Sequence, residues 1–424
     1  MKNRLIVISF DAVGARDLPF LKTLKNFKEF FETSSYCENV SSVYPSVTYP
    51  AHTSIVTGRY PSHHGVVNNT LVQPGRICSP DWMWQRKYVK GTTLYDEAIK
   101  NNMTVASLFW PVTAKSKITY NMPEVLANRP WQNQIVVSLK NGTPLYEFKL
   151  LKKFGKQVDG VHQPQLDNFN HQSALYTLEK YHPDLMLIHY TDVDTKRHEN
   201  GLDHEEVTNA LLRHDKRLGE IQEKLKDLGI YEETTIAILG DHYQMDVKQI
   251  VYFNYLFLTK GWINVKNGKI RDYQVLCHNA DGSCYIYVKN RKIQGDVEKL
   301  LKQCEENPIY GIERVYTGQE AGKMGADSAC DFMIEAKEGF YYLDEFETLT
   351  EPVKDAKKHV MWATHGYHPD KKDYQTFFAI KGPSIKQGIK IEKMSLVDEG
   401  PTLAKVISVN LLKTDGKCMD MIFK

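Results

Sequence analysis

Carboxylates and imidazoles, the side chains that bind divalent ions through oxygen and nitrogen, occur in short groups along this sequence. Asp194 and His198 are four residues apart, and Asp241 is directly followed by His242. His365 lies beside a glycine in a stretch that we expect to be a loop. Oxygen and nitrogen ligands without a thiolate favour zinc or another borderline divalent ion in an open catalytic site. Two metal ions could share these residues.

The hydroxyl group of Thr48 could act as a nucleophile. Thr48 stands in the stretch YPSVTYPAH, residues 44–52, with a proline on each side, and a run with helical character follows. We therefore expect it near a helix N-terminus, where a hydroxyl most often serves as an N-cap. A metal-bound alkoxide at that positive helix end is also a competent nucleophile for phosphorus. The residues alone leave both interpretations open.

The elements that must position these residues alternate between short apolar strands and longer amphipathic helices, as in parallel strands joined by crossover helices. The carboxyl ends of such strands form the edge where ligands bind, and Asp11, Asp194 and Asp241 each follow an expected strand. An isolated aspartate there is most often a cap or turn residue, so the neighbouring histidines carry the metal hypothesis. The expected core strands are 5–10, 104–110, 184–189, 235–240 and 375–381, and the expected helices are 18–32, 93–101, 172–181 and 205–228.

The pattern of expected strands and helices changes in the second half of the chain. Residues 265–357 read as a mixture of short strands and one helix, and a further core strand is expected after them at 375–381. We therefore predict an inserted α+β cap over residues 265–357, with residues 1–264 and 358–424 forming the core. Insertions of this kind often cover an active site.

The composition is that of a folded globular protein. The chain has 424 residues, of which 42% are hydrophobic and 25% charged, with a formal net charge of +2. Charges of one sign form no long run, and no stretch approaches the ~20 apolar residues of a membrane span, so we expect neither a nucleic-acid polymer nor a membrane as partner. The seven scattered cysteines suit reduced thiols. The N-terminal apolar run is too short for a signal peptide, and we expect a cytoplasmic protein.

Several segments in a fixed order resemble the nucleotide pyrophosphatase/phosphodiesterase branch of the alkaline phosphatase superfamily. They are residues 8–11, 45–52, 57–65, 69, 194–201, 240–242 and 364–367, and they span nearly the whole main domain. The resemblance implies a three-layer α/β/α core with a mostly parallel sheet, Thr48 as the nucleophile, and Asn69 as donor to a phosphoryl oxygen. It also implies two zinc ions, one held by Asp11, Thr48, Asp241 and His242, the other by Asp194, His198 and His365.

The activity that the resemblance implies is hydrolysis of phosphodiester or pyrophosphate bonds in nucleotide-type substrates through a covalent phospho-threonine. The neutral amide of Asn69 tolerates an esterified oxygen, which favours diesters over monoesters. A phosphonate hydrolase of the phosphonoacetate type would share the same metal site and is the first alternative, and a phosphomonoesterase is the next. A binding protein on an inactive form of this fold is disfavoured because every expected ligand is present.

Two positions depart from the family pattern without removing a ligand. Arg197 stands where a glycine usually precedes the histidine, and Tyr49 replaces the usual phenylalanine after the nucleophile. Tyr49 could stack on a base or aryl group of the substrate. We expect a small phosphorylated substrate, with a nucleotide as the first candidate, and a homo-oligomer is compatible with the sequence.

Overall fold

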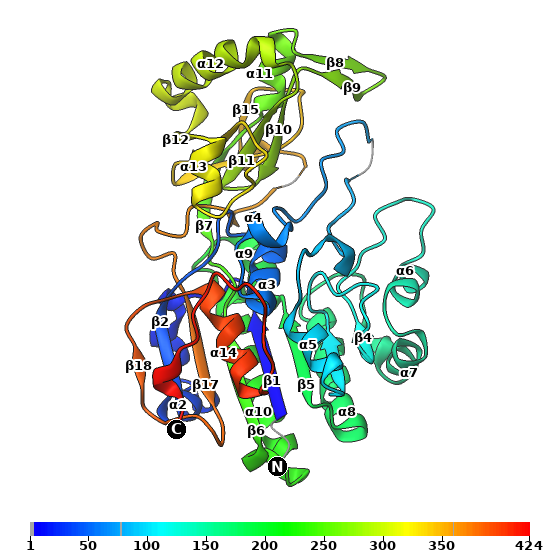
Figure 1. Ribbon diagram of the computed structural model, residues 1–424. Helices are drawn as coiled ribbons and strands as arrows, with labels where there is room; N and C mark the ends of the chain where they lie inside the picture. The colour runs from blue at the N-terminus through cyan, green and yellow to red at the C-terminus, as the bar shows by residue number, and fades with distance from the viewer. Residues whose placement is uncertain (1–3, 77–78, 359) are drawn as a thin grey trace.

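The computed structural model describes residues 4–76, 79–358 and 360–424. A mostly parallel sheet runs through its larger part in the order β18-β2-β17-β6-β1-β5-β3-β4, with β19 also paired to β2 (Figure 1). β17 runs antiparallel to β2 and β6, whereas β1 pairs in parallel with both β5 and β6. The strands are β1 (Arg4–Phe10), β2 (Ser35–Ser41), β3 (Val105–Leu108), β4 (Tyr120–Met122), β5 (Leu185–Tyr190), β6 (Thr234–Leu239), β17 (Thr376–Lys381), β18 (Lys390–Ile391) and β19 (Met394–Ser395).

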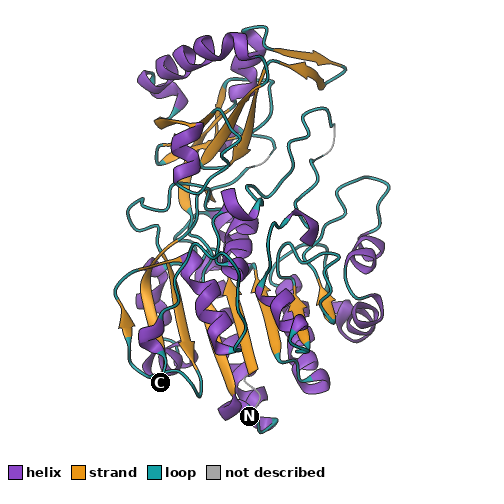
Figure 2. Ribbon diagram, in the orientation of Figure 1, coloured by secondary structure: helices purple, strands orange, loops and turns teal. Residues whose placement is uncertain are grey.

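Helices cover both faces of this sheet and complete three layers (Figure 2). Successive residues of a strand point to opposite faces, and β1 shows the consequence. Val7 packs in one apolar cluster with Ile55 and Leu403, whereas its neighbour Ile8 packs in another with Leu218. The helices around the sheet are α1 (Leu18–Leu21), α2 (Lys25–Glu32), α3 (Thr48–Thr57), α4 (Pro61–His64), α5 (Leu94–Lys100), α6 (Gln134–Asn141), α7 (Pro144–Phe154), α8 (Gln165–Tyr181), α9 (Asp192–Asn200), α10 (Glu205–Asp227) and α14 (Glu399–Val406).

The predicted core elements are present, with differences at their ends. The strand expected at 104–110 is shortened to β3, and the helix expected at 18–32 is divided into α1 and α2. The helix expected at 172–181 begins earlier, at Gln165. α6 and α7 are not anticipated by the sequence analysis. Their apolar residues do not form one buried stripe, because Leu145 is 78% exposed and Phe148 is 58% exposed.

A second group of elements lies above the carboxyl end of the main sheet (Figure 1). Its principal sheet has the order β10-β11-β13-β12, and a smaller sheet joins β14, β7 and β15, with β16 also paired to β7. The elements are β7 (Met245–Val251), α11 (Phe253–Thr259), β8 (Ile263–Lys266), β9 (Lys269–Tyr273), β10 (Val275–Ala280), β11 (Ser283–Val288), α12 (Gln294–Glu306), β12 (Ile312–Thr317), α13 (Gly318–Lys323), β13 (Phe332–Ala336), β14 (Gly339–Tyr342), β15 (Thr350–Pro352) and β16 (Ala363–Thr364).

One apolar cluster runs through these upper elements. It joins Ile250 of β7 and Phe253 of α11 to Ile286 of β11 and Leu301 of α12. β7 and α11 precede residue 265, where the sequence analysis begins its cap, and the boundaries of the cap at 265 and 357 stay a prediction.

Two further properties concern the described residues alone. None of their helices combines the length and apolar character that a membrane crossing requires. Their cysteines are free thiols, five of them buried, while Cys78 lies outside the described residues.

Candidate metal centre

The carboxyl ends of three adjacent strands bring the predicted ligands together. β1 lies between β5 and β6, all in parallel register. Asp11 directly follows β1, Asp194 and His198 lie on α9 just after β5, and Asp241 and His242 follow β6 after Gly240. These residues therefore lie close together at one edge of the sheet, as predicted.

His242 is at the centre of the first group of ligand atoms. Its Nε2 lies 3.3 Å from Asp11 Oδ1 and 3.2 Å from Asp241 Oδ2. The same nitrogen lies 3.2 Å from Thr48 Oγ1. Two ligand atoms that are each ~2.1 Å from a tetrahedral ion are about 3.4 Å apart. The two carboxylate oxygens are also buried without a hydrogen-bond partner. Spacing and free lone pairs therefore fit a zinc-sized ion.

The second group is built around Asp194. Its Oδ1 lies 3.3 Å from His198 Nε2 and 3.9 Å from His365 Nε2. His198 Nδ1 is 2.8 Å from the carbonyl oxygen of Ala363, to which it donates, so Nε2 is the nitrogen left to bind a metal. Ligand atoms of Asp11, Asp194 and His242 all lie within 4.8 Å of one another. The two groups are therefore neighbours in a single centre.

Thr48 occupies the first turn of α3, as predicted. Val47 is the N-cap residue, so the Thr48 hydroxyl does not cap the helix. The residue is 7% exposed, and its Oγ1 points to His242. The capping interpretation is thereby excluded, and the hydroxyl is left at the positive end of α3 beside the first ligand group.

Asn69 reaches the same helix start from a loop. Its Oδ1 accepts a hydrogen bond of 2.8 Å from the backbone N–H of Tyr49. The ring of Tyr49 is buried at 1% exposure and packs edge-on against Trp82, with 5.2 Å between the ring centroids. The predicted contact of Tyr49 with a substrate stays a prediction.

Burial and mutual repulsion dominate the electrostatics of the acids. Burial raises the pKa of Asp11 to about 7, and the charge of Asp194 adds to this rise. Burial likewise raises the pKa of Asp241 well above its usual value, with a further contribution from Asp11. Burial is the largest single influence on Asp194 and would raise its pKa, but the charge and hydrogen bond of His198 together with the charges of His365 and His242 outweigh it and lower that pKa. A divalent cation among these carboxylates would relieve the repulsion between them.

A histidine and a glutamate that the sequence analysis did not single out support Asp11. His189 on β5 has its Nε2 at 3.0 Å from Asp11 Oδ2, the oxygen turned away from the ligand cluster. Its Nδ1 lies 2.9 Å from Glu124 Oε2. Because Glu124 comes from the loop after β4, far away in sequence, no local motif signals this chain of contacts.

Two further supporting residues also escape sequence reasoning. Gln244 Nε2 donates to Asp194 Oδ1 at 2.5 Å, and Asp281 Oδ2 lies 3.4 Å from His365 Nδ1. Gln244 is close to His242 in sequence, which is a weak signal. Asp281 belongs to the turn between β10 and β11 and is brought to the ligands by the upper elements alone.

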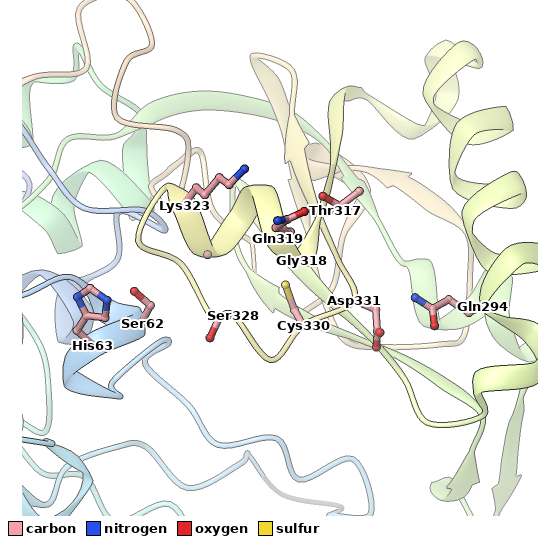
Figure 3. Close-up of a pocket in the computed structure, with 11 residues that line it drawn as sticks. Ser62, His63, Gln294, Thr317, Gly318, Gln319, Lys323, Ser328, Cys330 and Asp331 are labelled. Atoms are coloured by element: carbon pink, nitrogen blue, oxygen red, sulfur yellow. The ribbon is translucent and has the colours of Figure 1, made fainter.

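A polar cavity of about 680 Å³ lies between α4 and α13 (Figure 3). Ser62 and His63 come from α4, and Gly318, Gln319 and Lys323 come from α13. None of the predicted ligands lines it. The cavity therefore belongs to the contact between the two groups of elements and not to the candidate metal centre.

Comparisons with known proteins relate the sequence to nucleotide phosphodiesterases. The family described as type I phosphodiesterase/nucleotide pyrophosphatase matches residues 5–368. Ectonucleotide pyrophosphatase/phosphodiesterase family member 1 of Mus musculus is 25% identical over 257 residues, which cover 60% of this chain and 24% of that protein. Bis(5'-adenosyl)-triphosphatase ENPP4 of Homo sapiens is 21% identical over 431 residues, which cover 97% of this chain and 80% of that protein. The chain thus spans about a quarter of the length of the first relative.

Solved structures share the fold over the whole chain. Murine ectonucleotide pyrophosphatase/phosphodiesterase 5, an inactive variant in complex with AMP, has a TM-score of 0.70 at 16% identity and covers 100% of both chains. The human protein of the same name has a TM-score of 0.69 at 17% identity. At these identities the likeness establishes the architecture, and the predicted alkaline-phosphatase-like α/β core is confirmed.

Proposed function

This chain belongs to the type I phosphodiesterase/nucleotide pyrophosphatase family, and on that premise we propose that it hydrolyses phosphodiester or pyrophosphate bonds in nucleotide-type substrates. One observation carries the proposal. The Thr48 hydroxyl, which α3 does not use as a cap, lies 3.2 Å from His242 Nε2 within the candidate metal centre. A hydroxyl so placed can serve both as ligand and as nucleophile.

The seven predicted ligands would hold two divalent ions, and their oxygen and nitrogen donors suit zinc. Once bound, the ions would neutralise charge on the phosphoryl oxygens and favour the ionised form of the attacking hydroxyl. We assign Asp11, Thr48, Asp241 and His242 to one ion and Asp194, His198 and His365 to the other, and the short distances within each set support this assignment.

Thr48 would attack the phosphorus atom, and the bond to the leaving oxygen would break in line with the attack. The Thr48 oxygen would then carry the phosphoryl group, with its remaining ester, as a covalent phospho-threonine, and the leaving oxygen would depart with the proton that Thr48 gives up. Water would hydrolyse the phospho-threonine, release the phosphorylated product and return the free hydroxyl. The positive N-terminus of α3 favours negative charge at the position of Thr48 throughout.

Asn69 would bind the substrate phosphoryl group through its amide N–H groups. Because its Oδ1 is engaged by Tyr49, its NH₂ group is the part left for a ligand. The Asn69 amide is neutral and adds no positive charge beside the phosphorus. This supports a preference for esterified substrates over monoesters, which carry two negative charges. The neighbouring structure with AMP supports a nucleotide as the first substrate to examine.

The test is a comparison of substrates with the zinc-loaded protein. Bis(p-nitrophenyl) phosphate, p-nitrophenyl thymidine monophosphate, p-nitrophenyl phosphate and phosphonoacetate are assayed side by side. We expect the two diesters to have the highest kcat/KM, with the nucleotide diester ahead. A higher kcat/KM for phosphonoacetate would replace the proposal with a phosphonate hydrolase, and a higher value for the monoester would replace it with a phosphomonoesterase.

A further inference from the structure

Arg197 is a buried cation between two candidate ligands on α9. It lies one residue before His198, and 1% of it is exposed. A guanidinium stays protonated inside a protein and is costly to bury unless its N–H groups find partners.

The first partners of Arg197 belong to the loop after β1. Nη1 donates to the carbonyl oxygen of Ala12, and Nη2 donates to Asp17 Oδ1 at 2.6 Å. Ala12 has a φ of 59°, in the left-handed region that residues with a Cβ seldom adopt. Its N–H donates to Asp241 Oδ1 at 3.2 Å. The residue after Asp11 is thus held from both sides, by a candidate ligand and by Arg197.

Asp17 extends this contact along the same loop. Its second carboxylate oxygen accepts the N–H of Gly14 at 2.9 Å. A Cβ added at Gly14 would lie 2.4 Å from the ring of Tyr243, so the loop is packed against the residue that follows His242. The loop that carries Asp11 is therefore held by Asp17 and packed against Tyr243, and Arg197 contacts both of these side chains.

The remaining partner of Arg197 is Tyr243 itself. Nη2 lies 3.3 Å from the tyrosine hydroxyl, and the guanidinium carbon lies 4.5 Å from the centre of the ring. Tyr243 is adjacent to His242. Arg197 therefore touches the loop after β1 and the loop after β6 while its own backbone belongs to the helix that carries Asp194 and His198.

We propose that Arg197 is a positioning residue that sets the spacing between the two metal subsites. The proposal rests on the metal centre of the proposed function. A left-handed conformation is unfavourable for a residue with a Cβ, so the contacts on both sides of Ala12 must offset that cost. Without Arg197 the loop would relax, and Asp11 and Asp241 would move relative to the ligands on α9.

The test measures zinc binding by the metal-free protein, in competition with a chromophoric chelator. We expect Arg197→Met to bind at least one zinc ion ~10- to 100-fold more weakly than wild type, the usual effect of losing a residue that orients ligands. Arg197→Lys should restore little, because one ammonium group cannot reproduce a planar fork that meets three partners.

Arg217→Met is the matched control. Arg217 is 3% exposed, and Nη1 lies 3.3 Å from Asp167 and 3.1 Å from Asp192. Its loss also removes a buried guanidinium beside α9, so the melting temperature should fall in both variants. Zinc affinity should stay close to the wild-type value in Arg217→Met. A general loss of stability cannot produce that difference.

Tyr243→Phe keeps the proposal testable if Arg197→Met fails to fold, because it removes one partner without leaving a charge unpaired. We expect a smaller but measurable loss of zinc affinity from it. Equal zinc affinities in wild type, Arg197→Met and Tyr243→Phe would overturn the positioning role alone. A wild-type protein that binds no zinc would instead contradict the proposed function.

Discussion

The backbone N–H of Tyr49 donates a 2.8 Å hydrogen bond to Oδ1 of Asn69, and this contact fixes which side of the amide faces a ligand. A backbone N–H cannot accept, so the amide oxygen must be the partner and the NH₂ group is left free. Tyr49, the residue after the proposed nucleophile, thereby orients Asn69, the proposed hydrogen-bond donor to the phosphoryl group.

Asn69→Asp should therefore lose more activity than Asn69→Ala. Alanine removes the donor, and we expect kcat/KM for a nucleotide diester to fall by ~10²-fold, the usual cost of one donor to a developing oxyanion. Aspartate adds repulsion between its charge and the phosphoryl oxygens. Steady-state kinetics on p-nitrophenyl thymidine monophosphate measure both variants. A wild-type kcat/KM in Asn69→Ala would show that the amide does not contact the reacting group.

Glu124→Gln and His189→Asn should weaken metal binding. Glu124 orients His189, which in turn holds the Asp11 oxygen turned away from the ligand cluster. Partners of this kind typically contribute ~10- to 100-fold in metal affinity. Isothermal titration of the metal-free variants with zinc measures the change. Unchanged affinity in both would mean that the packing of Asp11 alone is sufficient to position it.

Removal of the metal should destabilise the fold. Buried carboxylates repel one another in the metal-free centre, and an ion that binds the folded state alone adds stability by mass action. We expect a chelator to lower the melting temperature and added zinc to restore it. Asp241→Asn should show a smaller response to zinc than wild type, because it loses a ligand oxygen. A melting temperature that is independent of zinc in the wild-type protein would contradict this expectation.

Glu147 on α7 should make stability depend on pH. Burial raises its pKa from 4.5 to about 7, although Ser138 donates to it. The folded state thus holds the proton more tightly than the unfolded state, so this contribution is complete below pH 4.5 and is lost as the pH rises through 7. Glu147→Gln cannot ionise and should be more stable than wild type at pH 8 by up to about 3 kcal/mol.

Urea unfolding at pH 4.5 and pH 8 measures that difference. Glu223→Gln is the matched control, because it makes the same change on the exposed surface of α10. An advantage of Glu147→Gln that is equally large at both pH values would point to packing and not to ionisation.

The clustering of the candidate ligands could be predicted because each lies just after a strand or on the helix that follows one. Strands that end at Phe10 and Leu239 place Asp11 and Asp241 just beyond their carboxyl ends. Because the two strands pair in parallel, both acids lie at the same edge of the sheet. The position of Thr48 at the start of a helix could be predicted from the prolines on either side of it. These are local signals. The family was predicted from the ordered segments that resemble it, and the match over residues 5–368 confirms it.

The supporting contacts could not be predicted, because they join segments that only the tertiary fold brings together. Glu124 meets His189 across the sheet edge, and Arg197 finds Ala12 and Tyr243 on two separate loops. The hairpin of α6 and α7 escaped prediction for another reason. It leaves large apolar side chains exposed, so its sequence lacks a single buried stripe.

Thr48→Ala tests the central claim most directly. Zinc-loaded wild type and Thr48→Ala are compared on p-nitrophenyl thymidine monophosphate, after zinc analysis has shown that both proteins hold the same amount of metal. Thr48 is the proposed nucleophile, so we expect kcat/KM to fall by at least ~10³-fold, while the other candidate ligands keep the metal bound. Hydrolysis by Thr48→Ala at the wild-type rate would contradict the assignment of the nucleophile and, with it, the covalent phospho-threonine.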